Sequence, residues 1–180
     1  EQSQGSGGRA LRVSATLVSA SLGLALATTR RFPLPTREDA ATASFFYGVV
    51  QAQVTTTGKP LLAVTPEYAY FYVHQPVEVE GSGFRYRAEA GAPGTEGVLA
   101  KVERGAYGLI VELPSRLPGG AFRAALVWNY HPILACRLGF FYGQDVYFLH
   151  VPRDSEPRFL PPAEARCGPF SELDALLRRK

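Results

Sequence analysis

The sequence lacks any uninterrupted run of roughly 18 apolar residues, the length that a membrane-spanning helix needs. The nearest approach, residues 10–27, is broken by Arg12, by several serines and by Gly23, and it lacks the cleavage pattern of a signal peptide. Because the chain begins at Glu1, we expect that a membrane anchor or an export signal preceded this sequence. The segment itself is not expected to span a bilayer.

A strong excess of one charge is also missing. The net charge is +3, and nearly all positive side chains are arginines, with only three lysines. That balance does not by itself indicate a nucleic-acid-binding protein. Methionine is absent and asparagine occurs only at Asn129. This composition is typical of GC-rich genomes and of thermophiles that avoid labile residues.

Recognisable catalytic, metal-binding and cofactor-binding motifs are missing as well. The three histidines, His74, His131 and His150, are not spaced as metal ligands, and the chain contains no HExxH or CxxC. The sequence around Ser82 lacks the flanks of a nucleophile elbow. We therefore expect no enzymatic activity, no metal and no small-molecule cofactor.

What the chain does contain is enough apolar sequence for a folded core, at 46% with 12% aromatic residues. Residues 1–8 are rich in Gly and Ser and predict a flexible lead-in, and residues 9–180 predict a single α+β domain. Apolar residues recur with a helical period from Arg9 to about Thr29. A second helix is expected over Thr36–Gln53, with Thr36 and Asp39 in a variant of the capping box.

From Leu61 onwards the apolar residues alternate with a period of two, which predicts strands. The expected strands are Leu61–Thr65, Glu67–His74, Val77–Glu80, Gly83–Glu89, Val98–Glu103, Tyr107–Leu113, Phe122–Asn129, Ile133–Phe141 and Val146–Val151. No helix-length pattern lies between them, so a mainly antiparallel sheet is favoured over parallel βαβ units. An irregular region, Pro152–Pro169, and a short helix at Ser171–Leu177 capped by Ser171 end the chain. The predicted fold class is α+β, with both longer helices packed on the sheet.

The two cysteines, Cys136 and Cys167, are 31 positions apart. Cys136 falls on an expected strand and Cys167 in the irregular region, so a disulfide would fasten that region to the sheet. Two buried free thiols in a cytosolic protein are the alternative. His131 lies near Cys136 in sequence, but a cysteine that faces inward from a strand is inert. We expect the disulfide, and with it an oxidising, extracytoplasmic compartment.

Two sequence features are candidate binding surfaces. Tyr68, Tyr70 and Tyr72 alternate along one expected strand, whose aromatic faces indicate either a central strand or contact with a partner. Arg85-Tyr86-Arg87 pairs cations with an aromatic ring and could follow a nucleic-acid strand. An ordinary solvent-exposed face is the alternative for this second feature.

The predicted N-terminal helix, strand-rich middle and C-terminal cysteine pair together resemble the soluble part of a type IV pilin or pseudopilin, in particular a minor pilin. The likeness is architectural. The diagnostic peptidase site is not in this sequence, residues 5–8 would interrupt a continuous helix, and the second helix and many strands exceed a minimal pilin.

The resemblance implies a non-enzymatic subunit of an extracellular fibre or secretion machinery, with other fibre or envelope proteins as partners. It also makes adhesion and DNA uptake candidate roles. The alternative is a binding or assembly module that is anchored to the cell envelope, in which residues 1–8 are the linker from the anchor.

Overall fold

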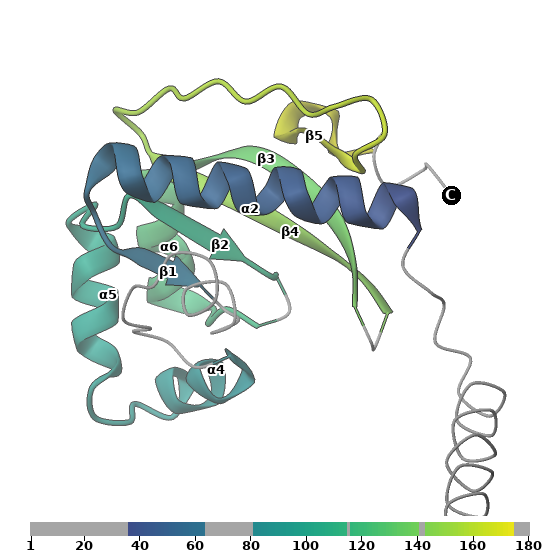
Figure 1. Ribbon diagram of the computed structural model, residues 1–180. Coiled ribbons are helices and arrows are strands. Elements are labelled where there is room, and N and C mark those ends of the chain that lie inside the picture. The colour runs from purple at the N-terminus through teal and green to yellow at the C-terminus, as the bar shows by residue number, and fades with distance from the viewer. Residues whose placement is uncertain (1–35, 64–80, 115, 141–142, 175–180) are drawn as a thin grey trace, which may run out of the picture. The chain divides into compact units, whose positions relative to one another are not determined.

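A five-stranded sheet forms the centre of the fold, in the order β1-β2-β4-β3-β5 (Figure 1). Its strands are β1 Leu61–Ala63, β2 Leu109–Glu112, β3 Tyr130–Phe140, β4 Gly143–Pro152 and β5 Cys167–Pro169. The computed structural model describes residues 36–63, 81–114, 116–140 and 143–174, which belong to one compact unit, Pro35–Lys180. The predicted lead-in, the helix Arg9–Thr29 and the strands Glu67–His74 and Val77–Glu80 lie outside the described residues.

The sheet is mainly antiparallel, and the α+β class is confirmed. β2 with β4, β4 with β3 and β3 with β5 are antiparallel pairs. β1 and β2, however, are parallel, with Leu61 opposite Leu109, so for this pair the preference for antiparallel strands over a parallel βαβ unit is wrong. Adjacent parallel strands cannot be joined by a tight turn and need a crossover. Here the connection includes two helices, α4 Gly81–Glu89 and α5 Thr95–Glu103.

Three of the predicted strands are helices. The segments Gly83–Glu89 and Val98–Glu103 lie within α4 and α5, and Phe122–Asn129 lies within α6, which spans Gly120–Asn129. Their buried residues have helical spacing: Val98 and Val102 on α5, and Phe122, Ala125 and Leu126 on α6. Segments of nine or ten residues contain too few turns to separate the two periods clearly.

The other strand predictions agree better with the structure. The expected strands Tyr107–Leu113, Ile133–Phe141 and Val146–Val151 correspond to β2, β3 and β4, and Leu61–Thr65 overlaps β1. β1 and β2 are buried along their whole length, as strands covered on both faces should be.

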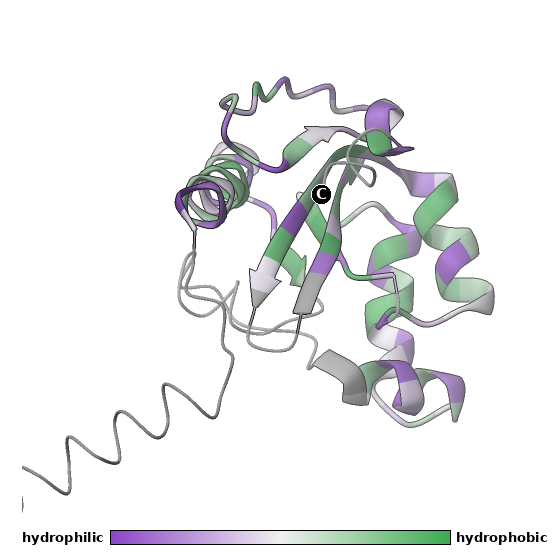
Figure 2. Ribbon diagram, turned by 90° about the vertical axis from the view of Figure 1, so that its right-hand side faces the viewer, coloured by the Kyte–Doolittle hydropathy of each residue, from purple (hydrophilic) through white to green (hydrophobic). Residues whose placement is uncertain are grey.

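Helix α2, Arg37–Thr57, confirms the second predicted helix and continues four residues beyond Gln53. It begins at the expected capping box, in which the Thr36 side chain accepts from the Asp39 amide and Asp39 accepts from the Thr36 amide. α2 lies across one face of the sheet, where the rings of Phe46 and Tyr147 meet edge to face at 6.0 Å. α5 and α6 lie on the other side, so the fold has three layers (Figure 2).

After β4 the chain follows an irregular path to β5, as expected for the proline-rich region. The helix predicted from Ser171 begins instead at Phe170, as the 3₁₀ turn η2 Phe170–Glu172 with Pro169 before it. No side chain caps this 3₁₀ turn, Leu173 and Asp174 after it are helical, and the rest of the predicted helix lies outside the described residues. The Phe170 ring packs edge to face on Phe148 of β4, at 5.1 Å. This contact between the two rings packs the turn against the sheet.

Gly108 lies where the last turn of α2 crosses the start of β2. The Gln53 side-chain amide donates to the Gly108 carbonyl at 3.3 Å, and a Cβ added at Gly108 would lie 2.2 Å from Thr57 Oγ1. We expect Gly108→Ala to lower the free energy of unfolding by about 1–3 kcal/mol, because the half-buried Thr57 side chain is held in place by its hydrogen bond to the Gln53 carbonyl and would have to move. Urea unfolding followed by circular dichroism measures this change.

Gly97 provides the matched control for that substitution. It lies within α5, and a Cβ added there meets nothing within 4 Å. Gly97→Ala should therefore raise the free energy of unfolding by about 0.5–1 kcal/mol, since alanine loses less backbone entropy in a helix. Equal effects of the two substitutions would contradict the close approach at Gly108.

Candidate functional site

Cys136 and Cys167 form a disulfide, so the alternative of two free thiols is wrong. Cys136 on β3 lies directly opposite Cys167 on β5, with the Cα atoms 4.1 Å apart, and both side chains are buried. Oxidised sulfur cannot act as a thiolate, which removes Cys136 as a nucleophile paired with His131. The bond fastens the end of the irregular region to the edge of the sheet, as predicted.

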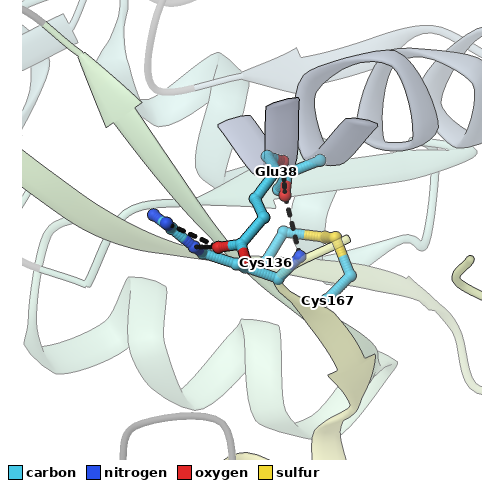
Figure 3. The surroundings of a disulfide bond; sticks show 5 residues. Glu38, Cys136 and Cys167 are labelled. Atoms are coloured by element: carbon cyan, nitrogen blue, oxygen red, sulfur yellow. Dashed lines mark hydrogen bonds and ion pairs between the residues drawn. A yellow bond between two sulfur atoms is a disulfide. The ribbon is translucent and has the colours of Figure 1, made fainter. Parts of the chain in front are cut away.

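Arg166, next to Cys167, connects the same edge to the first turn of α2, where Glu38 lies near the disulfide (Figure 3). Its guanidinium group donates to Glu38 Oε2 at 2.7 and 2.9 Å and to Asp39 Oδ1 at 3.1 Å. Its backbone amide donates to Thr42 Oγ1 at 2.7 Å, and its carbonyl accepts from the Arg137 amide at 2.8 Å. We call this set of contacts, together with the disulfide, the β5 clamp.

The charge of Arg166 also affects the helix cap. The pKa of Asp39 lies below its ordinary value, chiefly because the Thr36 amide donates to the carboxylate, with further lowering by the Thr36 hydroxyl and by Arg166. Asp39 therefore serves two elements at once: it caps α2 and it anchors the β5 clamp.

The candidate surface Arg85-Tyr86-Arg87 does not lie on a strand, and that part of the prediction is wrong. It lies on α4, where successive side chains point in different directions around the helix. Arg85 donates to Glu89 one turn later at 2.9 Å, and Tyr86 is 69% exposed. On the helix, Phe84 is buried in the core, where its ring centroid lies 5.9 Å from that of Phe122 on α6. The other candidate surface, Tyr68, Tyr70 and Tyr72, lies outside the described residues.

A buried charged cluster on the α6 side of the sheet was not predicted from the sequence. Glu112 is the last residue of β2, and it accepts a hydrogen bond from Arg123 of α6 at 2.5 Å. Its second carboxylate oxygen lies 2.6 Å from Nε2 of His150 on β4. The side chains of Glu112 and His150 are only 1% and 8% exposed, whereas that of Arg123 is 45% exposed. The cluster therefore extends from the sheet interior to the surface through a single guanidinium group.

Strand register explains how these two strand residues meet. His150 is opposite Ile110, and residues two apart on a strand point to the same face, so Glu112 lies diagonally across from His150. Arg123 then approaches from the helix that covers this face. A carboxylate within the apolar run Leu109–Leu113 is the one sequence signal that could have indicated a buried site.

The protonation of the cluster follows from its geometry. Burial alone would raise the pKa of Glu112, but the hydrogen bond to His150 and the attraction of His150 and Arg123 outweigh burial and lower that pKa. An ionised carboxylate only accepts hydrogen bonds, so the Nε2 of His150 is the donor. Because Nε2 is already engaged, only Nδ1 remains for any further partner.

A histidine oriented by a carboxylate is the arrangement that activates nucleophiles in catalytic triads. In the described part of the chain, however, no hydroxyl or thiol side chain is hydrogen-bonded to His150 or Glu112. All of their hydrogen bonds join β2, β4 and α6. We interpret the cluster as an electrostatic connection that fastens α6 onto the sheet.

The described residues contain no group of three or more His, Cys, Asp or Glu side chains arranged to hold a metal ion. None of the helices within the described ranges is long and apolar enough to cross a membrane. The chain matches no known protein-family model, and no curated protein or solved structure is significantly similar to it.

Proposed function

We propose that the chain is an extracytoplasmic binding or assembly module that is anchored to the cell envelope. The observation that carries the proposal is the Cys136–Cys167 disulfide. Both of its cysteines are buried, so it is a structural cross-link between two strands and not a reactive pair of surface cysteines. Structural disulfides of this kind form and persist in oxidising compartments.

The layered arrangement favours such a module over a fibre subunit. In the pilin-like alternative, a long N-terminal helix packs on one face of an antiparallel sheet. Here α2 covers one face of the sheet while α5 and α6 cover the other, and one strand pair is parallel (Figure 1). The contacts of Glu112 with Arg123 and of Phe46 with Tyr147 join these helices to the sheet. The interior of this unit is thus formed by its own elements, as in a module that folds independently.

Three measurements on the native cells test the proposal. Protease added to intact spheroplasts should degrade the protein, and alkylation before lysis should find neither cysteine reactive. Mechanical shearing of the cell surface should leave the protein with the envelope fraction, because an anchored module is not part of a detachable fibre. Protection from protease would overturn the extracytoplasmic location, and recovery in the sheared fibre fraction would support the pilin-like alternative instead.

A further inference from the structure

The outward face of α6 is apolar, although the helix already buries an apolar face against the sheet. Phe122, Ala125 and Leu126 point inward. The outward residues are Ala121, Ala124, Val127 and Trp128. Trp128 is 79% exposed and Val127 is 56% exposed, and the exposed Ala124 lies one turn before both, so these three residues occupy neighbouring positions on the helix surface. A contiguous group of this kind on a helix marks a contact surface, unlike a single exposed apolar residue.

Two arginines lie next to this apolar face. Arg153 donates through Nε and Nη2 to the Val127 carbonyl, at 3.1 and 2.7 Å, which places its guanidinium group beside the last turn of α6. No carboxylate among the described residues forms an ion pair with Arg153. Arg123 lies one turn before Val127 on α6 and remains 45% exposed. The helix itself, GAFRAALVWN, contains no acidic residue. The face therefore combines an indole, a small aliphatic surface and positive charge.

We propose that this face of α6 docks on the interface of a lipid bilayer that contains anionic head groups. Tryptophan concentrates at that interface because its ring is apolar and its N–H is polar, and guanidinium groups bind phosphate through paired hydrogen bonds. Trp128 and Val127 would enter the head-group region, while Arg153 contacts lipid phosphate and the exposed part of Arg123, whose Nη1 is held by Glu112, lies beside it.

The size of the face decides between a membrane and a second protein. A stable protein interface uses roughly 20–30 residues on each side, whereas the outward apolar face of α6 provides four. A contact of that size is too small to hold a partner or a second copy of the chain from free solution. It is sufficient for a domain that is already tethered, since tethering keeps the local concentration of the membrane surface high. This step rests on the envelope anchoring that we propose above.

Trp128 is the only tryptophan of the chain, so its fluorescence reports on this face alone. The experiment attaches the full chain through an N-terminal histidine tag to vesicles of phosphatidylcholine that carry a nickel-chelating lipid, with or without phosphatidylglycerol. We expect a blue shift of Trp128 emission and quenching by brominated lipids on the anionic vesicles, with loss of quenching by aqueous iodide. Arg153→Gln should weaken the interaction about fivefold, the effect of removing one cation near an anionic surface. Arg153→Lys, which keeps the charge, should restore most of it.

Leu160 supplies the control, because it is 90% exposed and lies in the irregular region between β4 and β5 rather than on α6. Leu160→Ser should leave the quenching of Trp128 unchanged. If brominated lipids fail to quench Trp128 on tethered anionic vesicles, the membrane-docking proposal is wrong. Protection of Trp128 from iodide in the absence of vesicles, increasing with protein concentration, would identify a second copy of the chain as the occupant instead. Either result leaves the proposed envelope location to be judged by the spheroplast measurement alone.

Discussion

Replacement of Glu112 by glutamine is expected to lower the free energy of unfolding by about 3–5 kcal/mol. The carboxylate is 1% exposed and holds His150 and Arg123 at the same time. A neutral amide of the same shape cannot accept from both as an anion does, and its own N–H group would face donors. The cost arises mainly because the single amide oxygen cannot accept from both Arg123 and His150, and His150, which is 8% exposed, has no other hydrogen-bond partner among the described residues. Urea unfolding followed by circular dichroism suits this measurement, since the single tryptophan is largely exposed.

Glu89→Gln is the matched control. Glu89 also accepts from an arginine, Arg85 at 2.9 Å, but both side chains are about 40% exposed, at 42% and 41%. Removal of an exposed helical pair of this kind costs about 0.3–0.5 kcal/mol. The difference between the two substitutions therefore measures the effect of burial. If Glu112→Gln were as mild as Glu89→Gln, the cluster would not be what fastens α6 to the sheet.

The same cluster gives stability a defined dependence on pH. The pKa of Glu112 is lowered in the folded protein relative to 4.5, so the folded state favours the ionised form. The stabilisation is fully present above the pKa of the unfolded chain and is lost as the pH falls through the lower folded pKa. The pKa of Asp39 is also lowered in the folded protein, so its ionisation changes stability with pH in the same direction. Comparison with Glu112→Gln isolates the contribution of Glu112, and the stability difference between the two proteins should shrink as the pH falls below 4.5.

The sequence was most informative where a feature is local. Thr36 and Asp39 are three residues apart, and this spacing alone is enough to predict the cap of α2. The disulfide was also predictable, because only two cysteines exist and one falls on a strand that was correctly identified. Both predictions depend on few assumptions about the rest of the chain.

The charged cluster was missed because it depends on an element that was assigned wrongly. Arg123 reaches Glu112 only if α6 forms over the sheet, whereas the sequence predicts a strand over Phe122–Asn129. Phe122 and Leu126 have the spacing of a helix face, but alternating apolar positions in the same ten residues also fit a strand. The same error hid the exposed face of α6, because the outward positions of a helix differ from those of a strand. Because this segment was assigned a strand period instead of a helix period, neither the buried charged cluster nor the exposed face of α6 could be predicted.

Loss of the disulfide is the second large effect that we expect. Cys136→Ala with Cys167→Ala should lower the free energy of unfolding by about 3–4 kcal/mol, since the bond closes a loop of 31 positions in the unfolded chain. The loss should also act locally, because β5 has only three residues and, among the strands that the structure describes, pairs only with β3. Without the cross-link, the β5 clamp depends on the contacts of Arg166 with α2.

Hydrogen exchange at one amide can separate the local effect from the global one. The Arg137 amide donates to the Arg166 carbonyl, so its protection reports whether the β5 clamp is closed. In the double alanine variant, this amide should exchange much faster than amides in the β2–β4 pair, which do not depend on β5. Arg166→Gln should increase exchange at Arg137 less, because it removes partly exposed ion pairs while the covalent bond keeps β5 in place. Equal acceleration at Arg137 and throughout β2 and β4 would mean that β5 opens only when the whole sheet unfolds, and the disulfide would then stabilise the fold as a whole rather than its edge.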